Sequence, residues 1–157
     1  MCGVSMKFKP IWPLEEFLPL VAFLLPKFRA IFTKSLIESS YKVKWKRALA
    51  RRRPTASKAE HPTFATAMEF LRVVREIERR SPELRLPVLM VHGSEDRVCD
   101  LGSAKAVFGL IGSEDKRLEV LEGTWHQLVA EREDMVEFGF EIIFDWIKER
   151  AKRGNCD

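Results

Sequence analysis

The sequence has few cysteines, few histidines and no apolar run long enough to cross a membrane. Its three cysteines, Cys2, Cys99 and Cys156, are odd in number and widely spaced among 157 residues, which argues against a disulfide framework and fits a reducing compartment. The three histidines are equally dispersed, so no metal site is predicted. The longest apolar run, residues 17–25, is about half of the roughly 20 residues that a membrane-spanning helix needs. We therefore expect a cytoplasmic protein without a bound metal.

The sequence also lacks the signature of a serine nucleophile. None of its nine serines lies in G-x-S-x-G, the strained turn between a strand and a helix that exposes the nucleophilic oxygen in many hydrolases. Ser94, Ser103 and Ser113 each follow a glycine, but no second glycine completes the pattern. An H-G-x-G loop, which would supply oxyanion-hole donors, is absent as well.

Two short apolar runs are the most informative features that the chain does contain. Residues 87–93 lead to Asp96, and residues 118–123 lead to His126. A Leu- and Val-rich run that ends at glycine is typical of a buried parallel strand, and open α/β sheets place their chemistry just beyond the carboxyl ends of such strands. An acid and a histidine at neighbouring strand ends are two of the three members of a serine-hydrolase triad.

Both residues also have a structural interpretation. Residues 93–96 could form an acidic turn before a helix, with Asp96 or Asp100 as its N-cap, and a histidine next to Trp125 could be packed or simply exposed. Cys99 lies three residues beyond Asp96 and could approach the same site. Its place on the loop of the acid argues against a nucleophilic role and favours a thiol that is sensitive to modification.

These segments resemble the carboxyl-terminal half of an α/β-hydrolase of the monoacylglycerol lipase and caffeoylshikimate esterase group, often described as serine aminopeptidase-like. The resemblance is carried by HGSEDRVCD (residues 92–100), DKRL (115–118) and GTWHQL (123–128). MCGVS and WPLE near the start resemble the stretch that leaves the sixth strand and enters the helical cap of the family, most closely in plant members.

The resemblance implies a serine hydrolase of carboxylic esters, with Asp96 as the triad acid, His126 as the general base and no cofactor. The oxyanion loop and nucleophile of the family would precede residue 1. We therefore expect a truncated product or a fragment that is inactive alone. A non-catalytic interaction product with inert triad residues is the alternative.

The expected fold class is α/β, in the form of an incomplete α/β-hydrolase fold. Residues 1–86 are expected to be the strand exit and helical cap, and residues 87–157 the last two parallel strands with their helices. The hydrophobic spacing predicts helices over residues 13–26 (kinked or divided at Pro19), 41–51, 63–80, 102–111 and 133–152. It predicts strands over 87–92 and 117–121, and mostly irregular structure over 27–40. In the last helix the expected buried stripe consists of Met135, Phe138, Ile142, Ile143, Trp146 and Ile147. Two parallel strands alone would nevertheless leave the apolar faces of the sheet and of the last helix partly exposed.

The resemblance further implies a cap that covers the site and admits an acyl or aromatic ester, so a small-molecule ester is the expected partner. The candidate lining residues are Phe17, Leu18, Val21, Phe23, Leu24, Leu25, Cys99 and Trp125. Packing in the protein core explains the cap residues equally well.

The net charge of +4 is unevenly distributed, because seven basic residues and no acid lie between Lys42 and Arg53. No nucleic-acid module surrounds this run, and no nucleic-acid partner is expected. A solvated helix is the favoured interpretation. Weak attraction to anionic membranes, and hence a peripheral membrane location, is the alternative.

Overall fold

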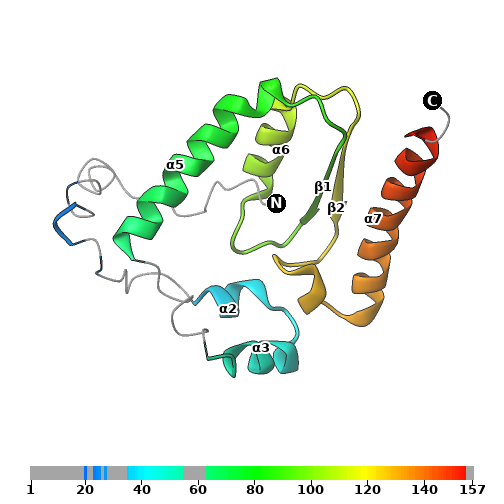
Figure 1. Cartoon of the computed structure of the whole chain (residues 1–157). Helices are drawn as coiled ribbons and strands as arrows, with labels where there is room; N and C mark the ends of the chain where they lie inside the picture. Colours follow the sequence, from blue (N-terminus) through cyan, green and yellow to red (C-terminus); the bar gives the residue numbers. More distant parts are fainter. Residues whose placement is uncertain (1–19, 21–22, 26, 28–34, 55–62, 155–157) are drawn as a thin grey trace.

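The fold is taken from a computed structural model of the chain (Figure 1). The residues described are 20, 23–25, 27, 35–54 and 63–154. Its elements, in chain order, are α2 (Leu36–Ser40), α3 (Lys44–Arg51), α5 (Phe64–Arg80), a 3-10 turn (Ser81–Glu83), β1 (Val88–Gly93), α6 (Leu101–Leu110), β2 (Lys116–Leu121), a second 3-10 turn (Leu128–Ala130) and α7 (Glu133–Gly154). No helix in these residues is both long and apolar enough to cross a membrane.

The two strands form a parallel sheet that is covered by helices on both sides. Val88 pairs with Lys116 at one end of the register and Gly93 with Leu121 at the other. In Figure 1 the sheet is seen nearly edge-on, with α5 and α6 on one side and α7 on the other. The in-register pairing brings the carboxyl ends of both strands to the same edge, so the loops that follow them are neighbours.

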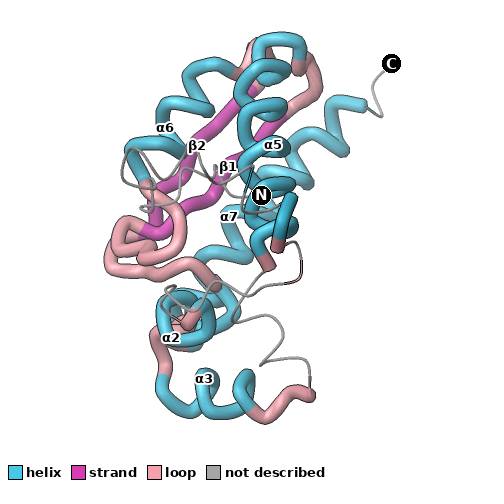
Figure 2. Tube along the Cα trace, turned by 90° about the vertical axis from the view of Figure 1, so that its left-hand side faces the viewer, coloured by secondary structure: helices cyan, strands magenta, loops and turns pink. Residues whose placement is uncertain are grey.

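Helices α2 and α3 lie beyond that edge, below the carboxyl ends of the strands in Figure 1 and again in Figure 2. Backbone hydrogen bonds fix this placement: the Val43 amide donates to the Ala130 carbonyl at 3.3 Å, and the Gln127 amide donates to the Ser40 carbonyl at 3.3 Å. The segment that sequence reasoning assigned to a cap thus contacts the loop that carries His126.

Local capping explains where several helices begin. Ser35, Thr63 and Asp100 are the N-caps of α2, α5 and α6, and each side-chain oxygen accepts a hydrogen bond from the amide three residues on. Such caps satisfy amides that the first helical turn leaves without a partner. Asp100, and not Asp96, is therefore the cap residue of α6.

Six predicted elements are confirmed, with bounds shifted by a few residues: α3, α5, β1, α6, β2 and α7. Residues 27–40 were expected to be mostly irregular, and the short helix α2 within them was not predicted. Glu38 in this short helix binds Arg47 and Arg51 of α3, so tertiary contacts stabilise a helix that sequence periodicity does not predict. Most of the helix expected over residues 13–26 lies outside the described residues.

The predicted buried stripe of α7 is only partly covered. Ile142, Ile143 and Trp146 are half-buried, whereas the side chains of Phe138 and Ile147 are 51% and 50% exposed. Val88, Met90 and Val120 of the sheet are likewise only partly buried. The expectation of exposed apolar faces is confirmed, and the assignment of Phe138 and Ile147 to the core was wrong.

Candidate functional site

The loops that follow β1 and β2 are joined directly to one another. The Ser94 amide donates to the Leu121 carbonyl at 3.0 Å, and the Glu95 amide donates to the Thr124 carbonyl at 3.0 Å. The Ser94 hydroxyl in turn accepts from the Gly123 amide at 2.8 Å. Ser94 therefore binds the two loops together.

Two glycines permit this close approach. A Cβ atom at Gly93 would collide with the carbonyl oxygens of Thr124 and Trp125, so only glycine fits at the end of β1. Gly123 has φ of 69°, a left-handed conformation that glycine adopts without steric cost. The strand-ending glycines of the sequence are thus required by the turn that brings His126 back toward β1.

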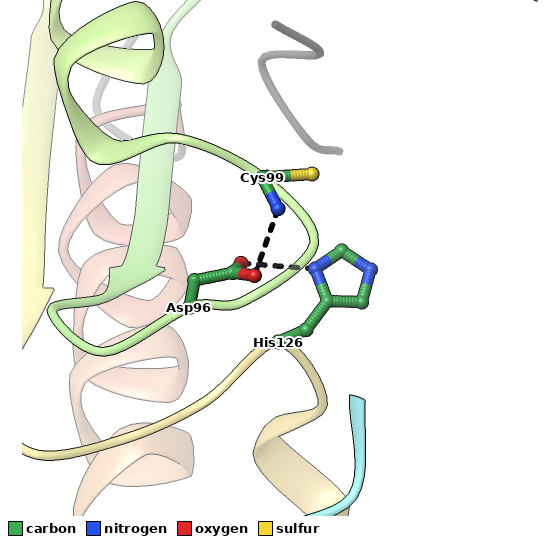
Figure 3. Close-up of side chains that lie close together, drawn as sticks. All are labelled: Asp96, Cys99 and His126. Atoms are coloured by element: carbon green, nitrogen blue, oxygen red, sulfur yellow. Dashed lines mark hydrogen bonds and ion pairs between the residues drawn. The ribbon is translucent and has the colours of Figure 1, made fainter. Parts of the chain in front are cut away.

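Asp96 and His126 form a hydrogen-bonded pair at the centre of these loops (Figure 3). The Nδ1 atom of His126 lies 2.9 Å from Oδ2 of Asp96, and Oδ1 of Asp96 accepts from the amides of Val98 at 2.7 Å and Cys99 at 2.8 Å. The Asp96 side chain is 4% exposed and that of His126 is 15% exposed. A carboxylate that accepts from Nδ1 fixes the ring orientation and leaves Nε2 as the basic nitrogen.

The surroundings of Asp96 favour its charged form. Burial acts to raise the pKa of the Asp96 carboxyl, but the hydrogen bond from His126 and those from the Cys99 and Val98 amides together hold that pKa below its usual value. Hydrogen bonds to the charged form of an acid have this effect generally. Asp96 is thus held as a carboxylate.

His92 lies close to the same carboxylate, from within the end of β1. Its side chain is 4% exposed, its Nε2 atom lies 3.7 Å from Oδ2 of Asp96, and its Nδ1 atom contacts the Gly93 carbonyl at 2.9 Å. At 3.7 Å the contact with Asp96 is too long for a hydrogen bond. His126, and not His92, is the hydrogen-bonded partner of the acid.

Trp125, a predicted lining residue, is 8% exposed because two guanidinium groups lie over its ring. The Arg97 guanidinium carbon lies 3.7 Å from the ring centroid and that of Arg47 lies 5.8 Å away. Cation–π contacts of this kind link the Asp96 loop, the His126 loop and α3.

The lining candidates of the cap that the structure describes are all exposed. Leu24 and Leu25 are 64% and 52% exposed, and Phe23 is exposed as well. Phe17, Leu18 and Val21 lie outside the described residues. A lining role for these residues and for Trp125 stays a prediction.

Sequence reasoning missed a set of basic and acidic residues that fasten the His126 loop. Lys42 donates to the Gly123 carbonyl and pairs with Glu95 at 3.4 Å. Lys46 donates to the carbonyls of Val129 at 3.1 Å and Glu131 at 2.7 Å. Part of the basic run thus binds backbone oxygens of the loop that carries His126, although a charge count alone predicts a solvated helix face.

Sequence reasoning also missed Glu131. It is 2% exposed, and its Oε1 atom accepts from the Trp125 amide at 2.6 Å, one residue before His126. A buried carboxylate is rare unless it is hydrogen-bonded. Position in the sequence gives no signal for it, because Glu131 lies in an otherwise charged segment.

Cys99 completes the immediate surroundings. It is 3% exposed and is not part of a disulfide. Figure 3 shows its Sγ atom near the imidazole of His126. Asp96, Cys99 and His126 each offer one potential ligand atom, and these atoms all lie within 4.8 Å of one another.

Comparison with known proteins identifies relatives among ester hydrolases. The chain is 35% identical over 84 residues to human monoglyceride lipase. The aligned segment covers 54% of this chain and 28% of the lipase. It is 29% identical over 93 residues to caffeoylshikimate esterase of Arabidopsis thaliana. Here the aligned segment covers 59% of this chain and 28% of the esterase. The chain therefore spans less than a third of the length of these curated relatives.

The structure of monoacylglycerol lipase from Paleococcus ferrophilus aligns with 94% of this chain and 56% of its own, with a TM-score of 0.78 and 12% sequence identity. This likeness shows that the described elements are part of an α/β-hydrolase fold. The model of the family described as "Serine aminopeptidase, S33" (Hydrolase_4) matches residues 1–133. The chain belongs to this hydrolase family.

Proposed function

We propose that these residues supply the acid and the base of a serine hydrolase that cleaves carboxylic esters of the acylglycerol type or related lipid and phenolic esters. The hydrogen bond between Asp96 and His126, at 2.9 Å, carries this proposal. It joins the two residues that the sequence placed at the ends of neighbouring strands. In this role residues 87–157 are part of the catalytic core, and residues 1–86 are the strand exit and the cap.

His126 acts as the general base and then as the general acid. Because Nδ1 donates to Asp96, the proton from a serine hydroxyl passes to Nε2, which Figure 3 shows on the side of the ring away from Asp96. The resulting imidazolium then protonates the leaving alcohol. Asp96 stays ionised and stabilises the imidazolium.

The nucleophile and the oxyanion donors come from sequence outside these 157 residues. No serine of this chain lies in G-x-S-x-G, and Ser94, the serine on the Asp96 loop, is engaged with the Gly123 amide. We therefore propose that the 157 residues alone do not hydrolyse esters.

The substrate class follows from the chemistry that two relatives share. One is named for a monoglyceride and the other for caffeoylshikimate, and both names describe a carboxylic ester. A triad in which His126 protonates an alcohol suits either ester.

The proposal is tested by joining the chain to the segment that its reading frame encodes upstream. If that segment contains H-G-x-G and G-x-S-x-G, the joined protein should hydrolyse p-nitrophenyl esters and monoacylglycerols. His126→Gln and Asp96→Asn should each lower kcat by at least about 10³-fold, while the matched changes His61→Gln and Glu95→Gln should leave kcat within about twofold. Equal activity of His126→Gln and the parent would refute the role of His126.

The isolated chain gives a complementary test. A fluorophosphonate probe, which reacts with activated serines, should not label it. Stoichiometric labelling that is lost on changing Asp96 or His126 would show that a serine within the 157 residues is the nucleophile.

Peripheral membrane contact is the second candidate function. It is favoured by the exposed side chains of Trp45 (61%) and Leu49 (56%) on α3, which lie beside exposed Lys44, Arg52 and Arg53. A vesicle sedimentation assay should detect binding to phosphatidylserine vesicles that Trp45→Ala with Leu49→Ala abolishes. Equal sedimentation with neutral vesicles would exclude an electrostatic attraction.

A further inference from the structure

We propose that Asp96, Cys99 and His126 bind a thiophilic divalent cation such as Zn²⁺. The three side chains come from two loops and supply one oxygen, one sulfur and one nitrogen ligand. Their ligand atoms lie within 4.8 Å of one another. The sequence predicts no metal site, because its histidines are dispersed, but the fold brings one histidine together with a carboxylate and a thiol.

The donor set matches the preferences of Zn²⁺. This ion binds thiolate sulfur at about 2.3 Å and imidazole nitrogen or carboxylate oxygen at about 2.0–2.2 Å, commonly with three protein ligands and a water molecule. A tetrahedral arrangement with these bond lengths separates the ligand atoms by about 3.3–3.6 Å. A separation of up to 4.8 Å therefore has to close by roughly 1 Å, which one rotation about a side-chain bond of Cys99 or His126 can supply.

Asp96 can bind a cation in place of its hydrogen bond from His126, while it keeps its two backbone partners. A carboxylate offers about four acceptor positions, and those of Asp96 receive the Val98 amide, the Cys99 amide and His126. The same backbone amides hold the carboxylate in place while a cation binds. Because the Asp96 and Cys99 side chains are buried, an ion held there is partly shielded from water, which strengthens its attraction to a thiolate and a carboxylate.

Binding is balanced by the release of one proton. The Cys99 thiol gives its proton to solvent and binds as a thiolate. Nδ1 of neutral His126, which lies 2.9 Å from Oδ2 of Asp96, donates its lone pair to the ion after its own proton has moved to Nε2 through solvent. The affinity should therefore rise with pH.

A consequence rests on the function proposed above. An ion bound to His126 occupies the base and prevents it from accepting the serine proton, so Zn²⁺ should inhibit the joined, active protein reversibly, and a chelator should restore its activity. Binding itself does not require activity, so the two proposals can fail separately.

The test of binding uses the reduced 157-residue chain and Cd²⁺, which reports a thiolate ligand through charge-transfer absorption in the near ultraviolet. The parent is the Cys2→Ser, Cys156→Ser double variant, in which Cys99 is the remaining thiol. We expect one Cd²⁺ to bind per chain, with the absorption lost in Cys99→Ser. In the same background, Asp96→Asn and His126→Gln should each weaken binding at least tenfold, whereas Glu95→Gln and His61→Gln should change it less than twofold.

Two outcomes would overturn the proposal. If Asp96→Asn and His126→Gln bind Cd²⁺ as tightly as the parent, the thiol alone binds the ion. If the double variant binds no Cd²⁺, the site formed by Asp96, Cys99 and His126 does not bind the ion.

A measurement on the unaltered chain guards against variants that fail to fold. Zn²⁺ titration followed by ¹⁵N NMR of the histidine rings should shift the ring nitrogens of His126 and leave those of His61 unchanged. Unshifted His126 nitrogens at saturating Zn²⁺ would overturn the proposal regardless of the variants.

Discussion

The loops around Asp96 and His126 differ sharply from the helices that flank the sheet. In the loops Asp96, Cys99, Thr124, Trp125 and Glu131 are all buried. By contrast, α5 contains no buried residue, and Phe138, Phe144 and Ile147 of α7 are each about half exposed. The loops of the site are therefore more fully buried than α5 and the apolar stripe of α7.

This difference shows that the geometry of the site depends on directional polar contacts more than on a large apolar core. The pair between Asp96 and His126 is held by backbone amides, by Ser94 and Glu131, and by Lys42 and Lys46. The ion pairs of α5 are exposed and Arg150 joins α7 to Asp115, but apolar burial of these helices requires more partners than the described residues provide. We therefore expect a locally ordered site in a protein of low global stability.

Asp96→Ala should cause the largest loss. It removes the partner of His126 and leaves the Val98 and Cys99 amides without an acceptor, which should lower the free energy of unfolding by about 2–4 kcal/mol. Urea unfolding followed by circular dichroism measures this change. The neighbouring Glu95→Ala is the control, because the Glu95 side chain is 57% exposed, and a similar loss in both variants would contradict the comparison.

The contribution of Asp96 should depend on pH in a defined direction. Its pKa in the folded protein lies below the ordinary value of 3.8, so the stabilisation is fully present above the unfolded pKa and is lost as the pH falls through the folded pKa. The difference in unfolding free energy between the parent and Asp96→Asn should therefore be constant from about pH 5 to 7 and shrink below about pH 4. A difference that grows on acidification would contradict the direction of this pKa.

Lys42→Met should have an intermediate effect. It removes the bond to the Gly123 carbonyl and the pair with Glu95, at a cost of about 1 kcal/mol. The Nδ1 proton of His126, observed by NMR at low field, should exchange faster with solvent because the two loops are less firmly joined. Lys44→Met, two residues along the same run and exposed, is the matched control, and equal exchange in both variants would show that Lys42 does not position the site.

Phe138→Gln with Phe144→Gln should have the smallest effect on stability, within about 0.5 kcal/mol for each change, because both side chains are half exposed. It should nevertheless raise the monomeric fraction in sedimentation velocity, since an exposed apolar face promotes self-association. Val107→Ala in α6, which is 6% exposed, should instead lower stability by about 2 kcal/mol without raising that fraction. A cooperative, monodisperse parent would show that the outer helices are adequately covered.

Sequence reasoning predicted the elements that depend on periodic or continuous apolar residues. The runs at residues 87–93 and 118–123 gave both strands, and the parallel order then placed Asp96 and His126 at one edge, where the structure joins them. The helix α2 was missed because it depends on ion pairs with α3. Glu131 and Lys42 were missed for the same reason, since their partners lie in contacts that local sequence does not encode.

The exposure of Phe138 and Ile147 was mispredicted for a different reason. Helical spacing identifies the face that is suited to burial, but it does not state whether a partner covers that face. The periodicity of α7 was read correctly, but periodicity alone does not give the amount of packing around the helix.

The missing side chain of Gly93 has a practical consequence for genetics. Because the Thr124 and Trp125 carbonyls occupy the space of a Cβ atom, one added methyl group at this position would push the His126 loop away from the acid. A Gly93→Ala allele would thus break the hydrogen bond between Asp96 and His126, although both side chains stay chemically intact. Such an allele would show the effect of misplacing the two side chains, as distinct from the effect of removing one of them.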